Sequence, residues 1–233
     1  MEDWSTHKIP CKLSPTYLWN QELVGLKRTL AEQEATLGVD HEETLQSVSD
    51  MGFHLIRAEN YKEAEPYFRR NLEGRERAHG PDHTRTLEAV CNMGCLLKDK
   101  GELDLAEPYL RRHLEGCERD HGPDHTRTLG AVCNMGLLLK DKGELDLAEP
   151  YLRRNLEGCE RVFGRDHPTT LTGVGNMGCL LQLKDELKDA LSFFCRAFEG
   201  RERILGRDHP GTIIAAERLS DLLAEIKEME EAK

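Results

Sequence analysis

Apolar side chains recur along this chain at the three- and four-residue spacing of amphipathic helices, and the pattern restarts at a fixed interval. One apolar stripe consists of Leu87, Val90, Met93 and Leu97, and the next consists of Leu105, Ala106, Leu110 and Leu114. Gly101 lies between the two stripes, and glycine commonly follows the last turn of a helix. The pattern therefore predicts an antiparallel helix pair, with helix A over residues 84–100 and helix B over residues 103–119.

The interval is 42 residues, as the spacing of the Asp-His pairs shows. These pairs are Asp40-His41, Asp82-His83, Asp124-His125, Asp166-His167 and Asp208-His209. From Gly80 to Arg119 the sequence returns one interval later with three differences, at Glu88/Gly130, Cys95/Leu137 and His113/Asn155. Such a period is typical of a stacked, all-α array, because no single helix pair can bury both of its apolar faces.

The repeat predicts how the chain is divided. We predict a flexible N-terminal arm (1–16), a single N-terminal helix (17–38), four repeats (39–80, 81–122, 123–164 and 165–206) and a C-terminal capping helix (207–233). On the capping helix, Leu219, Leu222, Leu223 and Ile226 are expected to face inward, which leaves a polar outer face.

The repeated residues resemble the tetratricopeptide repeat, in the 42-residue form of kinesin light chains and the nephrocystin family. The matching positions are Met93, Gly94, Leu97, Ala106 and Leu110, with equivalents Met51, Gly52, Leu55, Ala64 and Phe68; Met135, Gly136, Leu139, Ala148 and Leu152; and Met177, Gly178, Leu181, Ala190 and Phe194. The resemblance covers about residues 19–227 and implies an all-α fold, a right-handed α-solenoid of antiparallel helix pairs with about ten helices. It also implies a concave groove lined by the A helices, in which a protein or peptide segment binds without catalysis.

Glycine on helix A costs about 1 kcal/mol of helix propensity relative to alanine, so its recurrence predicts a close crossing of helices A and B. Helix B departs from the family pattern, because Asn71, His113 and Asn155 stand where a small alanine is usual. A tight contact between successive B helices is the simpler interpretation, and a functional role is the alternative. Pro108 is expected in the first turn of helix B, where a missing N–H costs little.

One asparagine in each of the second, third and fourth repeats forms a ladder on the groove side of helix A: Asn92, Asn134 and Asn176. An amide offers both a donor and an acceptor, so each could hold a peptide group of an extended ligand, as the resemblance to kinesin light chains implies. The alternative is that these amides cap or bridge neighbouring helices. The other candidate groove residues are Asp50, Phe53, Cys91, Cys95, Lys98, Cys133, Leu137, Lys140, Cys179 and Gln182.

The residues around the ladder narrow the choice of partner. Some tetratricopeptide domains clamp a C-terminal carboxylate with Lys and Arg, but the corresponding positions here are Glu88, Cys91, Gly130 and Cys133. A clamp of that kind is therefore not expected, and motor or cargo functions are not carried over. Assembly through the terminal half repeats, or a role as the regulatory arm of a larger complex, is the alternative to peptide binding; the chain is expected to be a monomer or weak oligomer.

The composition of the chain argues against nucleic-acid binding, membrane spans and secretion. The chain has 43 acidic and 32 basic residues, a net charge of −11, which argues against nucleic acid as a partner. No apolar run approaches the ~20 residues of a membrane span, and no secretory signal is evident. Eight cysteines without a CxxC pair are typical of reduced thiols, so we expect an intracellular, cytoplasmic protein.

No sequence motif for catalysis or cofactor binding is present, so we predict no enzyme, no cofactor and no metal site. The recurrent histidines are expected to cap or pack, because equivalent residues on neighbouring helices lie roughly 10 Å apart, too far to share one metal. Either Asp82 or His83 is the expected N-cap of its helix. Cys91 and Cys95 are four residues apart, and packing is favoured over a thiol pair that binds metal.

Overall fold

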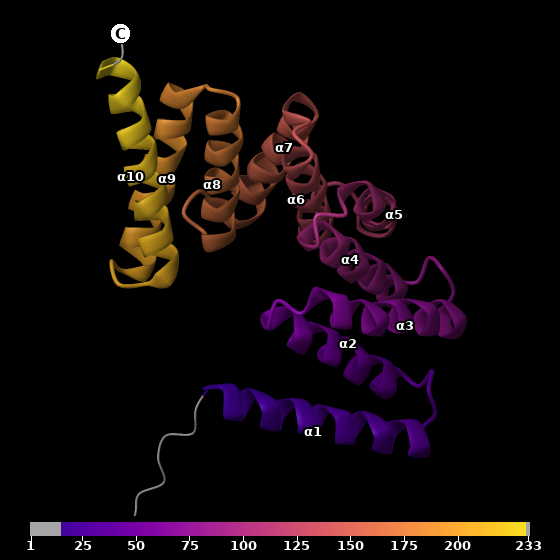
Figure 1. Ribbon diagram of the computed structural model, residues 1–233. Coiled ribbons are helices and arrows are strands. Elements are labelled where there is room, and N and C mark those ends of the chain that lie inside the picture. The colour runs from indigo at the N-terminus through magenta and orange to yellow at the C-terminus, as the bar shows by residue number, and fades with distance from the viewer. Residues whose placement is uncertain (1–14, 232–233) are drawn as a thin grey trace, which may run out of the picture. The chain divides into compact units, whose positions relative to one another are not determined.

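The computed structural model describes residues 15–231, and their side chains from residue 21 onward. Its helices are α1 (Pro15–Thr36), α2 (Glu42–Arg57), α3 (Tyr61–His79), α4 (Thr84–Asp99), α5 (Leu103–His121), α6 (Thr126–Asp141), α7 (Leu145–Phe163), α8 (Pro168–Leu183), α9 (Leu187–Leu205) and α10 (Pro210–Glu231). No strand occurs in these residues, so the predicted all-α fold of about ten helices is confirmed (Figure 1). The predicted arm, 1–16, lies almost entirely outside them.

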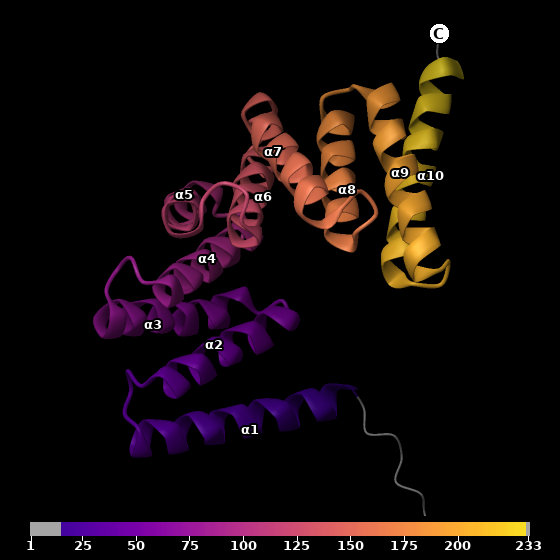
Figure 2. The same cartoon turned by 180° about the vertical axis from the view of Figure 1, so that it is seen from behind.

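The chain forms two compact units, and the boundary between Ala89 and Val90 falls within α4. In the first unit, α2 packs against both α1 and α3. In the second unit, helices adjacent in the chain pack in sequence from α5 to α10, and α8, α9 and α10 lie side by side in both views (Figures 1 and 2). The A helices of the four repeats are α2, α4, α6 and α8, and the B helices are α3, α5, α7 and α9.

Glycine brings helices A and B together at the predicted crossing. A Cβ atom at Gly136 would lie 2.7 Å from Leu152 Cδ2, and a Cβ at Gly178 would lie 2.7 Å from Phe194 Cε1. Both neighbours are almost fully buried. The backbone of helix A therefore approaches a large side chain of helix B more closely than any residue with a Cβ would allow, which explains the repeated glycine.

Two of the polar residues that interrupt the helix B pattern, Asn71 and Asn155, contact helix A of the same repeat. The buried Asn155 amide donates to the Leu129 carbonyl at 2.9 Å, and the Asn71 amide donates to the Leu45 carbonyl at 2.5 Å. The predicted contact between successive B helices is therefore wrong at these positions. A helical carbonyl oxygen has two lone pairs, so it accepts this bond in addition to its own helical bond.

The recurrent histidines cap the A helices, as predicted. The Nδ1 atom of His83 accepts a hydrogen bond from the Arg85 backbone N–H at 3.2 Å, so His83 rather than Asp82 is the cap. The same bond recurs at His41, His125, His167 and His209. Each one satisfies a first-turn N–H that has no partner within the helix.

Pro108 is the sixth residue of α5, so the expectation that it lies in the first turn is wrong. A residue there would normally donate its N–H to the carbonyl of Asp104, four residues earlier. Asp104 and Pro108 are both exposed, so water can hydrate that carbonyl and the cost of proline is reduced.

The capping helix α10 buries one stripe against its neighbours. Leu222 is fully buried, and Leu219 and Ile226 pack against the same core. Leu223 is 49% exposed, so the expectation that it faces inward is wrong. It lies next to Leu222 in the chain, and successive residues of a helix point about 100° apart.

Candidate functional site

The asparagine ladder crosses from one A helix to the next within the second unit. The Asn134 amide on α6 donates to Cys91 Sγ on α4 at 3.5 Å, and the Asn176 amide on α8 donates to Cys133 Sγ on α6 at 3.4 Å. The bridging role that the sequence left open is therefore present. Each amide still has its carbonyl oxygen and one further N–H available for a ligand, because a side-chain amide carries two donor hydrogens.

A cavity of about 510 Å³ lies between α6, α7 and α8. Cys133, Asn134 and Asn176 line it, so the structure brings these three predicted site residues together. Gly130, Gly173 and three threonines leave space between them, and no charged side chain lines the cavity. The arrangement offers amide groups in a neutral, moderately polar groove.

Burial makes Cys91 and Cys133, the cysteines that accept hydrogen bonds from the asparagine ladder, poor nucleophiles. It raises the pKa of the Cys133 thiol to about 11, so the thiol is protonated at neutral pH. Contact with Cys95 Sγ at 4.0 Å, together with burial, raises the pKa of Cys91 as well. Because the thiolate is the reactive form, Cys91 and Cys133 serve here as neutral packing groups and hydrogen-bond acceptors.

Other predicted groove residues are engaged with the protein itself. The Lys98 ammonium lies 2.8 Å from Asp99, and Lys140 lies 3.1 Å from Asp141. The Gln182 amide donates to Glu225 of α10 at 2.7 Å. Leu137 and Cys179 pack against the buried core. These residues border the ladder without lining the 510 Å³ cavity.

Asp50 and Phe53 belong to the first unit. They line a separate cavity of about 600 Å³ between α1 and α2, together with Glu22, Leu26 and His54. The Phe53 ring packs edge-on against Phe68 with a centroid distance of 5.1 Å. The structure therefore places these two predicted residues at a cavity of their own.

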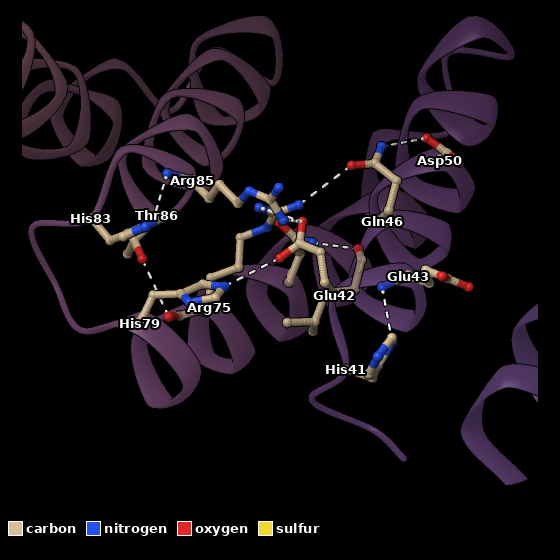
Figure 3. A network of polar contacts seen from close by, with 12 residues as sticks. His41, Glu42, Glu43, Gln46, Asp50, Arg75, His79, His83, Arg85 and Thr86 are labelled. Atoms are coloured by element: carbon tan, nitrogen blue, oxygen red, sulfur yellow. Dashed lines mark hydrogen bonds and ion pairs between the residues drawn. The ribbon is translucent and has the colours of Figure 1, made fainter. Parts of the chain in front are cut away.

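A polar network in the first unit was missed by the sequence analysis (Figure 3). Glu42 lies 2.5 Å from Arg85, 3.2 Å from His79 and 3.3 Å from Arg75. Arg75 is only 4% exposed. A signal was available, because Glu42 and Arg75 break the period: the next two repeats have threonine and cysteine at these positions.

Replacing Glu42 with glutamine is expected to lower the free energy of unfolding by about 1–2 kcal/mol, because it leaves the buried Arg75 facing other cations. Although burial alone would raise it, hydrogen bonds from Arg85 and His79 lower the pKa of Glu42 below its ordinary value. The carboxylate therefore stabilises the fold above its unfolded-state pKa of about 4.3, and this contribution disappears as pH falls through the lowered folded-state value.

Urea unfolding at several pH values tests this prediction. The difference between the parent and Glu42→Gln should be constant near neutral pH and shrink as the solution is made more acidic than pH ~4. Glu43→Gln is the matched control, because Glu43 is the adjacent residue and is exposed. An equal loss of stability in both variants would contradict the role given to the network.

Comparison with known proteins places the chain in a family. The family described as tetratricopeptide repeat matches residues 43–119 and 127–203, more than half of the chain. The chain belongs to the tetratricopeptide repeat family. No curated protein sequence matches it.

Solved tetratricopeptide structures share the fold at low sequence identity. BtubC (BKLC) from P. vanneervenii is 15% identical, with a TM-score of 0.68 over 90% of this chain and 92% of that one. A candidate kinesin light chain from Podosopora anserina, with nearly identical TPR-like repeats, is 13% identical, with a TM-score of 0.67 over 80% and 89% of the two chains. The prediction of a tetratricopeptide array like that of kinesin light chains is confirmed at the level of fold.

None of the helices in residues 15–231 is long and apolar enough to cross a bilayer. No group of three or more His, Cys, Asp or Glu side chains among these residues is arranged to hold a metal ion.

Proposed function

We propose that this tetratricopeptide protein is a non-catalytic interaction scaffold that holds an extended segment of a partner protein in the cavity between α6, α7 and α8. The observation that carries the proposal is the pair of amides, Asn134 and Asn176, at one neutral cavity. Each has bonding capacity left after its bond to a cysteine.

The spacing of the ladder suits a peptide backbone. Packed helices lie about 8–10 Å apart, and an extended chain advances about 3.3 Å per residue. Successive asparagines would therefore meet peptide groups about three residues apart. The amide recognises backbone rather than side chain, so specificity must come from the rest of the cavity.

The lining of the cavity favours a segment with small or apolar side chains at this point. Gly130 and Gly173 leave room, and the remaining surface comes from threonines and apolar groups such as Leu129 and Phe163. A charged ligand side chain would find no counter-charge here and would lose hydration without compensation.

Replacing both Asn134 and Asn176 with alanine is expected to weaken partner binding by ~1 kcal/mol for each hydrogen bond lost, because neutral bonds typically contribute about that much. Partners recovered by affinity capture and identified by mass spectrometry would be titrated against the parent and the double variant by calorimetry. Circular dichroism would establish that the helix content is unchanged.

The control variant replaces the cysteine acceptor of each hydrogen bond in place of the asparagine donor. Cys91→Ala with Cys133→Ala removes the sulfur acceptors but keeps both amides, so partner affinity should stay the same or increase. If the asparagine variant binds as tightly as the parent, the ladder has only a structural role and the groove is not the binding site.

Self-association through α10 is the second candidate, because this helix exposes Ile213, Ile214 and Leu223. Burying such side chains against a second copy would be favourable. Light scattering over a range of protein concentrations separates the two functions, since a constant monomeric mass would exclude self-assembly.

A further inference from the structure

A second cavity, of about 370 Å³, continues from the groove toward the C-terminal helix. It shares Pro168, Thr172 and Asn176 with the larger cavity, and it also reaches α9 and α10. Its lining includes Arg201, Arg218 and His209 but no Asp or Glu. This is unusual in a chain with a net charge of −11.

Both arginines donate hydrogen bonds to neutral groups only. Arg201 is half-buried and donates to the Gly211 carbonyl at 3.1 Å and to the Thr172 hydroxyl at 3.4 Å. The Arg218 guanidinium contacts Cys179 Sγ. Among residues 15–231, no carboxylate lies within ion-pair distance of either arginine, whereas Arg161 on α7 and Arg203 on α9 pair with Asp124 and Asp166.

The positive charges of Arg201 and Arg218 also repel each other. Burial and the proximity of Arg218 lower the pKa of Arg201 below its ordinary value, although it remains a cation at neutral pH. Pro168 and Gly211 place the first turns of α8 and α10 at the same cavity, and helix N-termini carry partial positive charge. The cavity therefore has an unbalanced positive potential that a bound anion would relieve.

Arg201 and Arg218 differ from the residues that stand one period earlier in the sequence. Arg201 stands one period after Cys159, and Arg218 stands one period after Asn176. The last helices thus carry guanidinium groups where the second and third repeats have cysteine and where the second to fourth repeats have asparagine; the first repeat has Arg75 at the position equivalent to Arg201. The expectation that no carboxylate clamp exists concerned positions on helix A, and these arginines are on α9 and α10.

We propose that the cavity between α8, α9 and α10 binds a side-chain carboxylate of an acidic peptide segment, whose backbone continues past Asn176 into the neutral groove. The proposal rests on the proposed function and adds the chemical class of the partner. Guanidinium groups suit it, because each presents paired N–H donors that match a carboxylate.

The test uses fluorescence anisotropy with the full chain and a labelled eight-residue peptide, Ser-Gly-Ser-Glu-Glu-Ser-Gly-Ser. A second peptide has Gln in place of both Glu, and a third has phosphoserine in their place. At low salt, the Glu peptide is expected to bind ~10-fold more tightly than the Gln peptide, since charge-assisted bonds are about twice as strong as neutral ones. Rising salt should reduce the difference.

Three variants locate the site. Arg201→Gln should lower the affinity for the Glu peptide by ~10-fold. Arg218→Glu should abolish the preference for Glu over Gln, while the melting temperature stays the same or rises, because the new carboxylate faces Arg201 and relieves the repulsion. Arg161→Gln is the control, since that arginine is exposed and paired with Asp124, and it should leave binding unchanged.

The proposal is overturned if the Glu peptide shows no measurable binding, if the Glu and Gln peptides bind equally, or if Arg201→Gln and Arg218→Glu bind like the parent. Binding of the phosphoserine peptide alone would also overturn it. Asn134→Ala separates the two proposals, because Asn134 lines only the larger cavity. If Asn134→Ala leaves Glu-peptide binding intact while Arg218→Glu removes it, the result supports the anion-binding cavity and contradicts peptide binding in the larger cavity. If Asn134→Ala weakens Glu-peptide binding while Arg218→Glu does not, the result contradicts the anion-binding cavity alone.

Discussion

Gly136→Leu is expected to lower the free energy of unfolding by about 2–3 kcal/mol, because it forces a side chain into a filled helix crossing. A Cβ there would lie 2.7 Å from Leu152 Cδ2, 2.8 Å from Leu152 Cγ and 3.1 Å from Tyr151 Cβ, so rotation of one methyl group cannot remove every clash. Thermal and urea unfolding of the whole chain measure the loss. Several probes should be used, because repeat arrays can unfold in more than one step.

Gly130→Ala on the same helix supplies a control of opposite sign. A Cβ at Gly130 would have no heavy atom within 4 Å, and the preceding repeat has Glu88 at this position. Alanine should therefore stabilise α6 by up to about 1 kcal/mol through helix propensity alone. Destabilisation of similar size in both variants would show that glycine at position 136 has no special role.

The period explains why so much of the fold could be predicted. Because one pattern occurs in four copies, helix boundaries that would be uncertain in one copy can be assigned from all of them. Helix A of the second repeat was predicted over residues 84–100, and the structure has it at Thr84–Asp99. The glycine crossing was predicted because a residue that weakens a helix in every copy needs a compensating contact. Leu152 and Phe194 of helix B fill the crossing, and the sequence could not identify them, because periodicity gives the face of a helix and not its offset along the neighbour.

The buried asparagines show that periodicity does not identify which helix a side chain contacts. Asn71 and Asn155 were expected at a contact between B helices, yet their amides reach the carbonyls of Leu45 and Leu129 on helix A. Choosing between these partners requires the crossing angle of the pair. Sequence spacing alone does not contain that angle, because several packing classes share the same apolar stripe.

The candidate site was predictable where the period holds. Asn134 and Asn176 were predicted to share one groove, and both line the same cavity. A cysteine directly precedes the asparagine in two copies, at Cys91 and Cys133, and these two cysteines accept the hydrogen bonds that join neighbouring A helices. The residues that were missed break the period. Glu42 and Arg75 in the first repeat have that property, and a search for charged departures from the repeat would have found them.

Phe194→Ala is expected to cost about 3–5 kcal/mol, the largest effect of any substitution considered, because it empties the volume of a buried aromatic ring. The Phe194 side chain is 2% exposed and closes the crossing at Gly178, where it touches helix A directly. The neighbouring repeats have leucine at the equivalent position, Leu110 and Leu152, so Phe194→Leu should cost far less. Urea unfolding monitored by circular dichroism gives both values.

Adding Gly178→Ala tests whether the crossing itself is responsible. Alone, the new methyl group would lie 2.7 Å from the Phe194 ring and should destabilise α8 against α9. In the Phe194→Ala background the ring is absent, so the methyl group fills part of the space and adds helix propensity. The double-mutant cycle should therefore show a favourable coupling of about 1 kcal/mol or more, as residues in direct contact do. Simple additivity would mean that the two residues stabilise the fold independently, and the close approach of α8 and α9 at Gly178 would then not explain the recurrent glycine.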